Sequence, residues 1–165
     1  MHIINLKTED VKKILPHRDP FLFIDEVLSV HCPELQKDLG EYEMKDLNGA
    51  EVKAKYSTKK DHGIFQGHFP DYPIFPGVCQ VEMMAQATSF VVCLLHKDPF
   101  GKKMDVALLG VDSARFRKPI FPEMELDIQT KLLKIRGPFI TSECKIFHND
   151  QLMSEVTVMA SLKFE

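Results

Sequence analysis

The feature that most constrains the fold is an apolar stretch over residues 78–95, VCQVEMMAQATSFVVCLL, interrupted by Gln80, Glu82 and Gln86. It predicts a helix over residues 77–96 that is apolar on nearly every side. Such a helix is stable in water only when other elements cover it all round. A bilayer span needs about 20 largely apolar residues, and a carboxylate at its centre is costly. We therefore expect a buried core helix and no membrane span.

Strand-like segments on both sides of this helix are available to cover it. β-branched and aromatic residues, or a two-residue alternation, predict strands over residues 21–30, 52–56, 104–111, 124–128, 140–147 and 152–164, with 104–111 buried. A turn at Asn149-Asp150 joins the last two. Several strands around one long helix indicate an α+β fold, in which an antiparallel sheet curls around the helix.

The remaining segments are predicted to be a short helix and two loops. Thr8 can cap a helix over residues 9–15 that ends at Pro16. Residues 31–50 are rich in acids and are expected to be a solvated loop. Residues 63–77 contain three glycines and three prolines, which predicts an ordered loop.

Composition narrows the class of protein. The 165 residues are the size of one domain, so we expect a single domain over 1–165. A net charge of -3 argues against a nucleic-acid partner, because such domains are usually basic. The first ten residues lack the basic and apolar regions of a signal peptide. Four scattered cysteines form no C-x-x-C pair and predict free, mostly buried thiols in the cytoplasm.

Glu82 is the unusual residue of the apolar stretch. Glutamate is rarely buried unless it is paired, because an isolated carboxylate is costly to remove from water. One interpretation is that Glu82 reaches the edge of the helix and finds solvent or a cation. The other is that burial raises its pKa, so that it holds a proton near neutral pH and serves as a general acid.

His68 is the candidate base, although a lone histidine in a loop is more often a surface residue. Its neighbours Gly67 and Pro70 favour a rigid loop, which is a suitable place for a catalytic group. Pro76-Gly77 then opens the predicted helix and leaves free N–H groups at its positive end. These donors suit a carbonyl oxygen that becomes negative in a transition state, although a plain helix start is the commoner explanation.

Two other chemistries are conceivable for the same segment, a cysteine nucleophile and a metal site. Cys79, in the first turn of the predicted helix, would be a nucleophile of an acyl transferase or thioesterase if its pKa were depressed. Its apolar neighbours favour a small buried side chain instead. His62 and His68 lack the further Cys, His or Asp spacing of a metal site, so no metal is expected.

Three blocks of the sequence resemble one enzyme family. Residues 67–78 read GHFPDYPIFPGV and residues 82–86 read EMMAQ. They resemble the signature G-H-F-P-x-x-P-x-x-P-G-x-x-x-x-E-x-x-A-Q of the β-hydroxyacyl-acyl carrier protein dehydratases of bacterial type II fatty acid synthesis. The family's catalytic His and Glu stand at the same spacing as His68 and Glu82, fourteen positions apart. Residues 15–22, LPHRDPFL, and 116–122, FRKPIFP, resemble two further blocks of the family.

The resemblance implies a hot-dog fold and a homodimer, in some members a trimer of dimers, with active sites shared between subunits. It implies that His68 removes the α-proton of a (3R)-hydroxyacyl-acyl carrier protein, and that Glu82, directly or through water, protonates the departing hydroxyl to give the trans-2-enoyl product. The Gly77 N–H would polarise the thioester carbonyl. A Glu at position 82, where the dehydratase/isomerase relatives usually carry Asp, favours the dehydratase branch. No cofactor is implied.

The resemblance also suggests where the substrate and its carrier bind. Phe75, Met83 and Phe121 are candidates for the wall of the acyl tunnel. Arg117 and Lys118 are candidates for contact with the acidic acyl carrier protein, although a solvated charged face explains them equally well.

Two alternative functions remain open at this point. A hot-dog thioesterase or enoyl hydratase of a lipid or polyketide route would share the fold, and a thioesterase would release free thiol. A non-catalytic acyl-binding protein would be expected to lack His68 or Glu82, and both are present. The sequence departs from the family pattern at residues 60–64, in the longer acidic segment 31–50, and after Pro122, but not at His68, Gly77 or Glu82.

Overall fold

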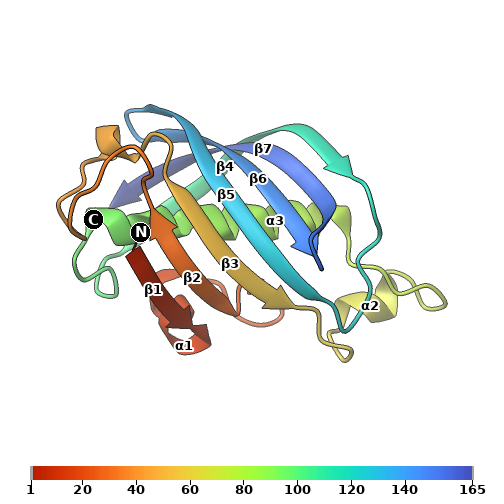
Figure 1. The fold of residues 1–165 in the computed structure, drawn as a ribbon. Helices are drawn as coiled ribbons and strands as arrows, with labels where there is room; N and C mark the ends of the chain where they lie inside the picture. Colours follow the sequence, from red (N-terminus) through yellow and green to blue (C-terminus); the bar gives the residue numbers. More distant parts are fainter. Residues whose placement is uncertain (1, 165) are drawn as a thin grey trace.

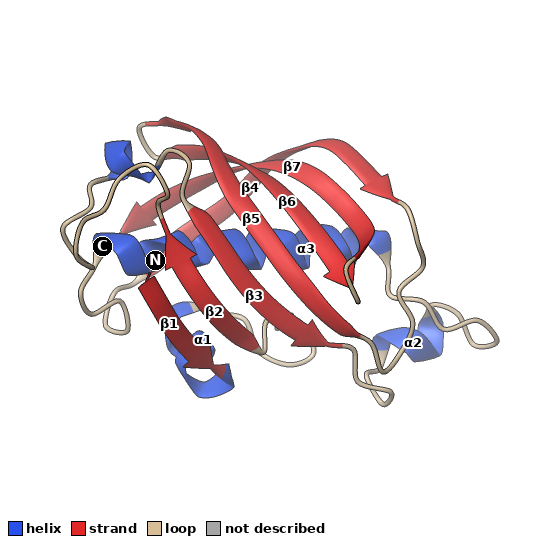
Figure 2. Ribbon diagram, viewed as in Figure 1, coloured by secondary structure: helices blue, strands red, loops and turns tan. Residues whose placement is uncertain are grey.

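A seven-stranded antiparallel sheet wraps around one long helix in the computed structural model, which describes residues 2–164 (Figures 1 and 2). The strand order is β1-β2-β3-β5-β6-β7-β4. The strands are β1 (His2–Lys7), β2 (Glu26–His31), β3 (Glu51–Ser57), β4 (Met104–Phe116), β5 (Glu125–Arg136), β6 (Phe139–His148) and β7 (Gln151–Phe164). This α+β arrangement is the predicted hot-dog fold.

The central helix is α3 (Gly77–Thr88), continued by a 3-10 turn (Ser89–Val91) and by α4 (Val92–Leu95). The sequence predicted one uninterrupted helix here. The hydroxyls of Thr88 and Ser89 donate to the carbonyls of Met84 and Ala85, at 3.1 and 3.4 Å. Side chains that bond back to the preceding turn in this way compete with the helical ladder, which accounts for the change of helix type.

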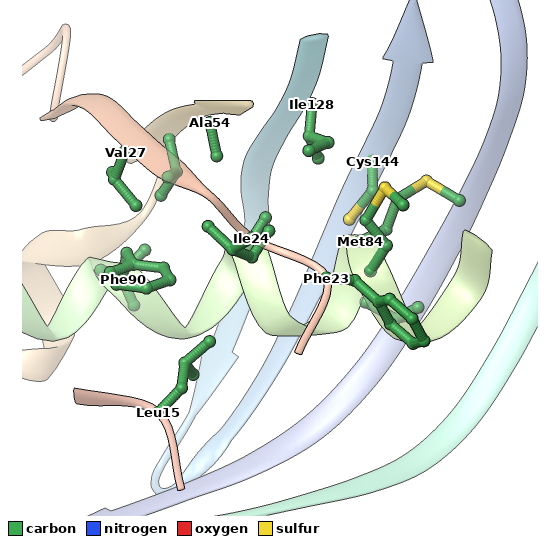
Figure 3. Close-up of a cluster of buried hydrophobic side chains, with 14 of the residues drawn as sticks. Leu15, Phe23, Ile24, Val27, Ala54, Met84, Phe90, Ile128 and Cys144 are labelled. Carbon is green, nitrogen blue, oxygen red and sulfur yellow. The ribbon is translucent and has the colours of Figure 1, made fainter. Parts of the chain in front are cut away.

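The core lies between this helix and the concave side of the sheet. In Figure 3, Met84 lies beside Cys144 of β6 and Phe90 lies nearest Val27 of β2, so both ends of the helical segment pack against the sheet. Leu15, Phe23 and Ile24, which precede β2, cover another side of the helix and are also fully buried. The segment Gly77–Leu95 is long and apolar enough to cross a membrane, but 78% of its most apolar window is buried inside the fold, as in the core helix of a soluble protein.

The strand predicted over residues 21–30 was wrong in its first half, because β2 begins only at Glu26. In this half, the side-chain amide of Gln86 makes the backbone hydrogen bonds that a neighbouring strand would otherwise make. Its Nε2 donates to the carbonyl of Phe21 and its Oε1 accepts from the N–H of Phe23, both at 2.9 Å. A buried amide on the helix therefore satisfies the backbone of the segment that covers it.

The prediction that residues 104–111 form a buried strand was wrong about burial. β4 is an edge strand, because it pairs with β7 alone within residues 2–164. Val106, Leu108, Leu109 and Val111 are 38–48% exposed. An apolar sequence thus lies at an uncovered edge, which sequence periodicity cannot distinguish from the interior of a sheet.

Smaller differences concern the ends and loops. β1 was not predicted, and Thr8 lies inside α1 (Thr8–Ile14), where its hydroxyl donates to the carbonyl of Asp25 at 3.1 Å and does not cap the helix. A short helix α2 (Ile64–Gly67) begins the predicted loop 63–77. The acidic segment 31–50 contains a 3-10 helix (Met44–Leu47) and is less solvated than predicted, because Tyr42 and Leu47 are buried in it.

Candidate functional site

His68 directly follows α2, in a loop whose backbone is fixed on both sides. The N–H of Ile74 donates to the His68 carbonyl at 2.9 Å, and the N–H of Phe75 donates to the carbonyl of Ile120 at 2.8 Å. The His68 ring stacks on Phe69, with ring centroids 4.1 Å apart. These contacts hold a half-buried imidazole in one orientation.

The tautomer of His68 follows from its hydrogen bond. Its Nδ1 lies 2.9 Å from the carbonyl oxygen of Ile74. A carbonyl only accepts, so Nδ1 carries the hydrogen and the neutral ring leaves a lone pair on Nε2. In this tautomer Nε2 is the ring nitrogen that can accept a proton.

A cavity of about 270 Å³ opens beside this ring. It is lined by His68, Ile74, Phe75, Gly77, Gln80, Phe116, Arg117, Lys118 and Pro119. The cavity brings together the predicted base, the predicted carbonyl-binding position and both predicted carrier contacts.

Gly77 is the first residue of α3 and allows the Phe116 ring to approach the helix. A Cβ at this position would lie 2.9 Å from the ring. The N–H groups of Cys79 and Gln80 donate to the carbonyl of Pro76, both at 3.1 Å. The Gly77 N–H makes no hydrogen bond within residues 2–164. It stands at the positive end of the helix and remains available to an oxygen in the cavity.

Glu82 lies one turn further along α3 and is held by two side chains. His17 Nε2 is 3.1 Å from Glu82 Oε1, and Gln86 Nε2 donates to the same oxygen at 2.9 Å. His17 lies in the segment between α1 and β2, whose backbone is bonded to Gln86. The Glu82 side chain is 23% exposed, so it is only partly withdrawn from water.

The net pKa of Glu82 is lowered, so the interpretation in which burial raises it was wrong; the partly exposed carboxylate beside His17 is closer to the other interpretation, a Glu82 that reaches the edge of the helix. The hydrogen bond from His17 lowers the pKa of this carboxyl, and Gln86 adds to the effect, so that together they outweigh the opposing contribution of burial. The apolar neighbours along the helix correctly indicated desolvation. They could not reveal a donor 65 positions earlier in the chain.

The structure does not bring His68 and Glu82 together within one chain. Glu82 is absent from the wall of the cavity that holds His68, and no hydrogen bond or ion pair joins them in the part of the chain described. The base and the acid of the predicted pair thus lie in separate surroundings.

The remaining predicted positions divide between the cavity and the rest of the fold. Phe75 is buried and lines the cavity, but Met83 is fully buried in the core and Phe121 packs against Tyr72 outside it, with ring centroids 5.7 Å apart. Arg117 and Lys118 are exposed on the cavity rim. Arg117 is paired with a carboxylate of β7, Glu155, at 2.7 Å.

Sequence analysis missed the roles of His17 and Gln86. Both stand in the blocks that resemble the family, LPHRDPFL and EMMAQ, so a signal was present. What the sequence lacked was the contact between these blocks, since the Gln86 amide joins them through hydrogen bonds that span more than 60 positions.

Cys79 lacks the environment of a nucleophile. Burial, followed by the charge of Glu82, raises the pKa of its thiol, opposite to the depressed pKa that a catalytic cysteine requires. All four cysteines are free and buried, as predicted. Among residues 2–164 no group of three or more His, Cys, Asp or Glu side chains is arranged to hold a metal ion.

Comparison with known proteins identifies the family. The FabA-like domain model matches residues 15–157. The chain belongs to the FabA-like family. It is 35% identical to the 3-hydroxyacyl-[acyl-carrier-protein] dehydratase FabZ of Campylobacter fetus, over 93% of this chain and 95% of that protein. It is 33% identical to the protein of the same name from Syntrophobacter fumaroxidans, over 93% of each chain.

Solved structures share the fold of this FabA-like chain. The dehydratase heterocomplex ApeI:P from Xenorhabdus doucetiae aligns with a TM-score of 0.68 and 21% identity, covering 93% of this chain and 90% of that one. A probable thioesterase from Bartonella henselae aligns with a TM-score of 0.53 and 15% identity, over 70% and 91% of the two chains. At these identities the likeness concerns the fold alone.

The state of Cys79 leads to a prediction about its reactivity. Because the thiol is buried and its pKa is raised, iodoacetamide should label Cys79 slowly in the native protein at neutral pH, and faster as the pH rises toward that pKa. Mass spectrometry of the peptide that contains Cys79 gives the rate, with unfolded protein as the control. Rapid labelling of the native protein at neutral pH would restore the nucleophile hypothesis.

Proposed function

We propose that this FabA-like chain is a 3-hydroxyacyl-[acyl-carrier-protein] dehydratase of fatty acid biosynthesis, a hydro-lyase that forms trans-2-enoyl products from (3R)-hydroxyacyl thioesters. The whole chain, residues 1–165, acts as one hot-dog domain. The observation that carries the proposal is the pairing of a fixed His68, with Nε2 free, and an unbonded Gly77 N–H in one cavity. Relatives that are 33–35% identical over almost the whole chain carry this name.

The elimination uses three groups of the protein. His68 Nε2 takes the proton from C2 while the Gly77 N–H stabilises the charge that develops on the thioester oxygen. The C3–O bond then breaks, and Glu82 gives its proton to the departing oxygen, directly or through one water. A C2=C3 double bond and water are formed, and His68 returns its proton to Glu82 through solvent. Acid–base chemistry alone completes the reaction, so it requires no cofactor and no metal.

The lowered pKa of Glu82 makes this acid depend on the complete site. In the isolated chain His17 and Gln86 favour the carboxylate. A substrate and a second protein surface would remove the remaining 23% exposure of Glu82, and desolvation favours the protonated form. Glu82 therefore takes up its proton as the site closes around the substrate.

A second copy of the chain is proposed to complete the site. His68 and Glu82 do not meet in one chain, and the apolar edge strand β4 is exposed next to the helix start, where Val78 is 77% exposed. Pairing β4 with β4 of another copy would cover this edge and bring the acid of one subunit to the base of the other. A trimer of such dimers stays an expectation from the resemblance.

The carrier is proposed to dock on the cavity rim, in the cytoplasm, where the acyl carrier protein presents its thioester. Arg117 and Lys118 supply positive charge there, but Glu155 partly neutralises Arg117, so Lys118 offers the less compensated charge. Phe75, which lines the same cavity as His68, is proposed to form part of the wall of the acyl tunnel. Met83 and Phe121 remain tunnel candidates only if the second copy opens a path to them.

The reaction is tested by incubating the protein with a 3-hydroxyacyl carrier-protein thioester and following the products by mass spectrometry. The wild type should form the enoyl thioester, and His68→Ala or Glu82→Gln should lower kcat by about 10²- to 10⁴-fold, the usual contribution of a general base or acid. His148→Ala, which changes a histidine on β6, should retain activity. Release of free acid and thiol would identify a thioesterase, and no turnover by the wild type would contradict the assigned substrate.

Carrier docking is tested by reversing the charges at the cavity rim. The Arg117→Glu, Lys118→Glu double variant should bind the carrier about tenfold more weakly at low salt, with a smaller loss at high salt where charges are screened. Lys45→Glu is the matched control, because the 3-10 helix Met44–Leu47 lies at the other end of the molecule from α2 (Figure 1). Equal carrier affinity of the double variant and the wild type at low salt would exclude this docking surface.

A further inference from the structure

We propose that His17 is a positioning residue for Glu82, which selects the carboxylate oxygen that faces the substrate and keeps it ready to exchange a proton. The inference rests on the proposed function, because it concerns the acid of that reaction. The two oxygens of the Glu82 carboxylate have different surroundings. Both donors that reach this carboxylate, His17 Nε2 and Gln86 Nε2, bind the same oxygen, Oε1.

The second oxygen, Oε2, makes no hydrogen bond or ion pair to any of residues 2–164. A carboxylate held by two donors on one oxygen cannot rotate freely, because rotation would break both bonds. Oε1 is thereby occupied by hydrogen bonds from His17 and Gln86. Oε2 is the oxygen that can carry the catalytic proton. Gln86 alone would anchor Oε1 from one direction, and His17 supplies the second.

His17 is itself firmly placed, although it lies outside regular structure. The Arg18 guanidinium donates to the carbonyl of His17 at 2.6 Å, to that of Leu15 at 2.9 Å and to that of Lys12 at 3.0 Å. It thus ties the backbone at His17 to the end of α1. The His17 ring also stacks on Phe21, with centroids 6.4 Å apart and planes at 28°. The histidine is held from its backbone and from its ring face.

The surroundings of the ring show which nitrogen donates to Glu82. Nε2 faces the carboxylate and so carries the hydrogen. Nδ1 is buried and has no hydrogen-bond partner among the residues described. Nε2 is therefore the one ring nitrogen that bonds to another of the residues described. The hydrogen bond from Nε2 orients the carboxylate through Oε1.

Two opposing influences act on the pKa of the Glu82 carboxyl. The hydrogen bond from His17 is the largest cause of the lowered pKa of Glu82, and burial acts in the opposite direction. The other groups that face Glu82 are the neutral Gln86 amide and the Cys79 thiol, whose pKa Glu82 helps to raise. His17 is thus the group on the chain whose removal should change the proton affinity of Glu82 most.

A purely structural role for the pair fits less well. The side chains of His17 and Glu82 are 30% and 23% exposed, and partly exposed pairs contribute little to stability. The Phe21–Phe23 backbone is secured by Gln86 and the loop by Arg18, both independently of the His17 ring. Removing the ring should therefore leave the fold and the melting temperature nearly unchanged.

The test is a titration of the Glu82 carboxyl by NMR on the full-length protein labelled with ¹³C at glutamate side chains. Comparison with Glu82→Gln assigns the resonance. His17→Ala removes the donor and should raise the titration midpoint of Glu82. His17→Gln places an amide N–H near the position of Nε2 and should restore the midpoint largely toward that of the wild type. His148→Ala is the control and should leave it unchanged.

Steady-state kinetics of the same variants complete the test. His17→Ala should lower kcat about ten- to hundredfold, part of what a general acid contributes, with little change in KM, and His17→Gln should recover much of the loss. An unchanged Glu82 midpoint in His17→Ala, or a changed midpoint with unaltered kcat, would overturn the positioning role. A wild type that forms no enoyl product, while the midpoint still shifts, would contradict the proposed function and support the His17–Glu82 pairing.

Discussion

A helix that is apolar on nearly every side can exist in water only if the rest of the chain covers it, and this requirement organises the whole protein. The sheet covers one side of Gly77–Leu95, and the segment before β2 covers another (Figure 3). Glu82 is the one carboxylate in this buried segment. The covering segment must therefore also supply hydrogen bonds to this carboxylate, and His17 and Gln86 do so.

The Gln86 amide connects the segment that covers the helix with the Glu82 carboxylate. It satisfies the backbone at Phe21 and Phe23 and, through the same Nε2, contacts Glu82. The Gln86 side chain that closes the core on this side thus also holds the Glu82 carboxylate. The LPHRDPFL and EMMAQ blocks meet here, and their residues support one another across more than 60 positions of sequence.

His68 is held separately, in the loop after α2. Hydrogen bonds that its backbone and its ring make with Ile74 fix it there. The helix start supplies an unbonded N–H beside it. His68 and Glu82 are thus each held by their own contacts within one chain, and in the proposed dimer a second copy brings them together. The same proposed dimer would cover the apolar strand β4, which lies exposed at the sheet edge of the single chain.

Much of this could be predicted from the sequence, because the decisive signals are local. The apolar helix, the alternation of Val52, Ala54 and Tyr56 in β3, and the blocks around His68 and Glu82 led to the fold and family that the structure and the comparisons confirm. Their catalytic roles stay predictions. Sequence reasoning failed where a distant partner decides the outcome. Gln86 replaces a strand at Phe21, β4 lies at an edge, and His17 reverses the expected pKa shift of Glu82.

The central claim is that one complete site draws His68 from one subunit and Glu82 from another. It is tested most directly by mixing two inactive variants, His68→Ala and Glu82→Gln, after unfolding and refolding them together. Random pairing into two-fold dimers should restore about a quarter of wild-type activity, because half of the dimers are mixed and each of these contains one intact site of two. Mass spectrometry verifies that the refolded mixture contains mixed dimers. If it does and the mixture is still as inactive as the separate variants, the shared site is contradicted.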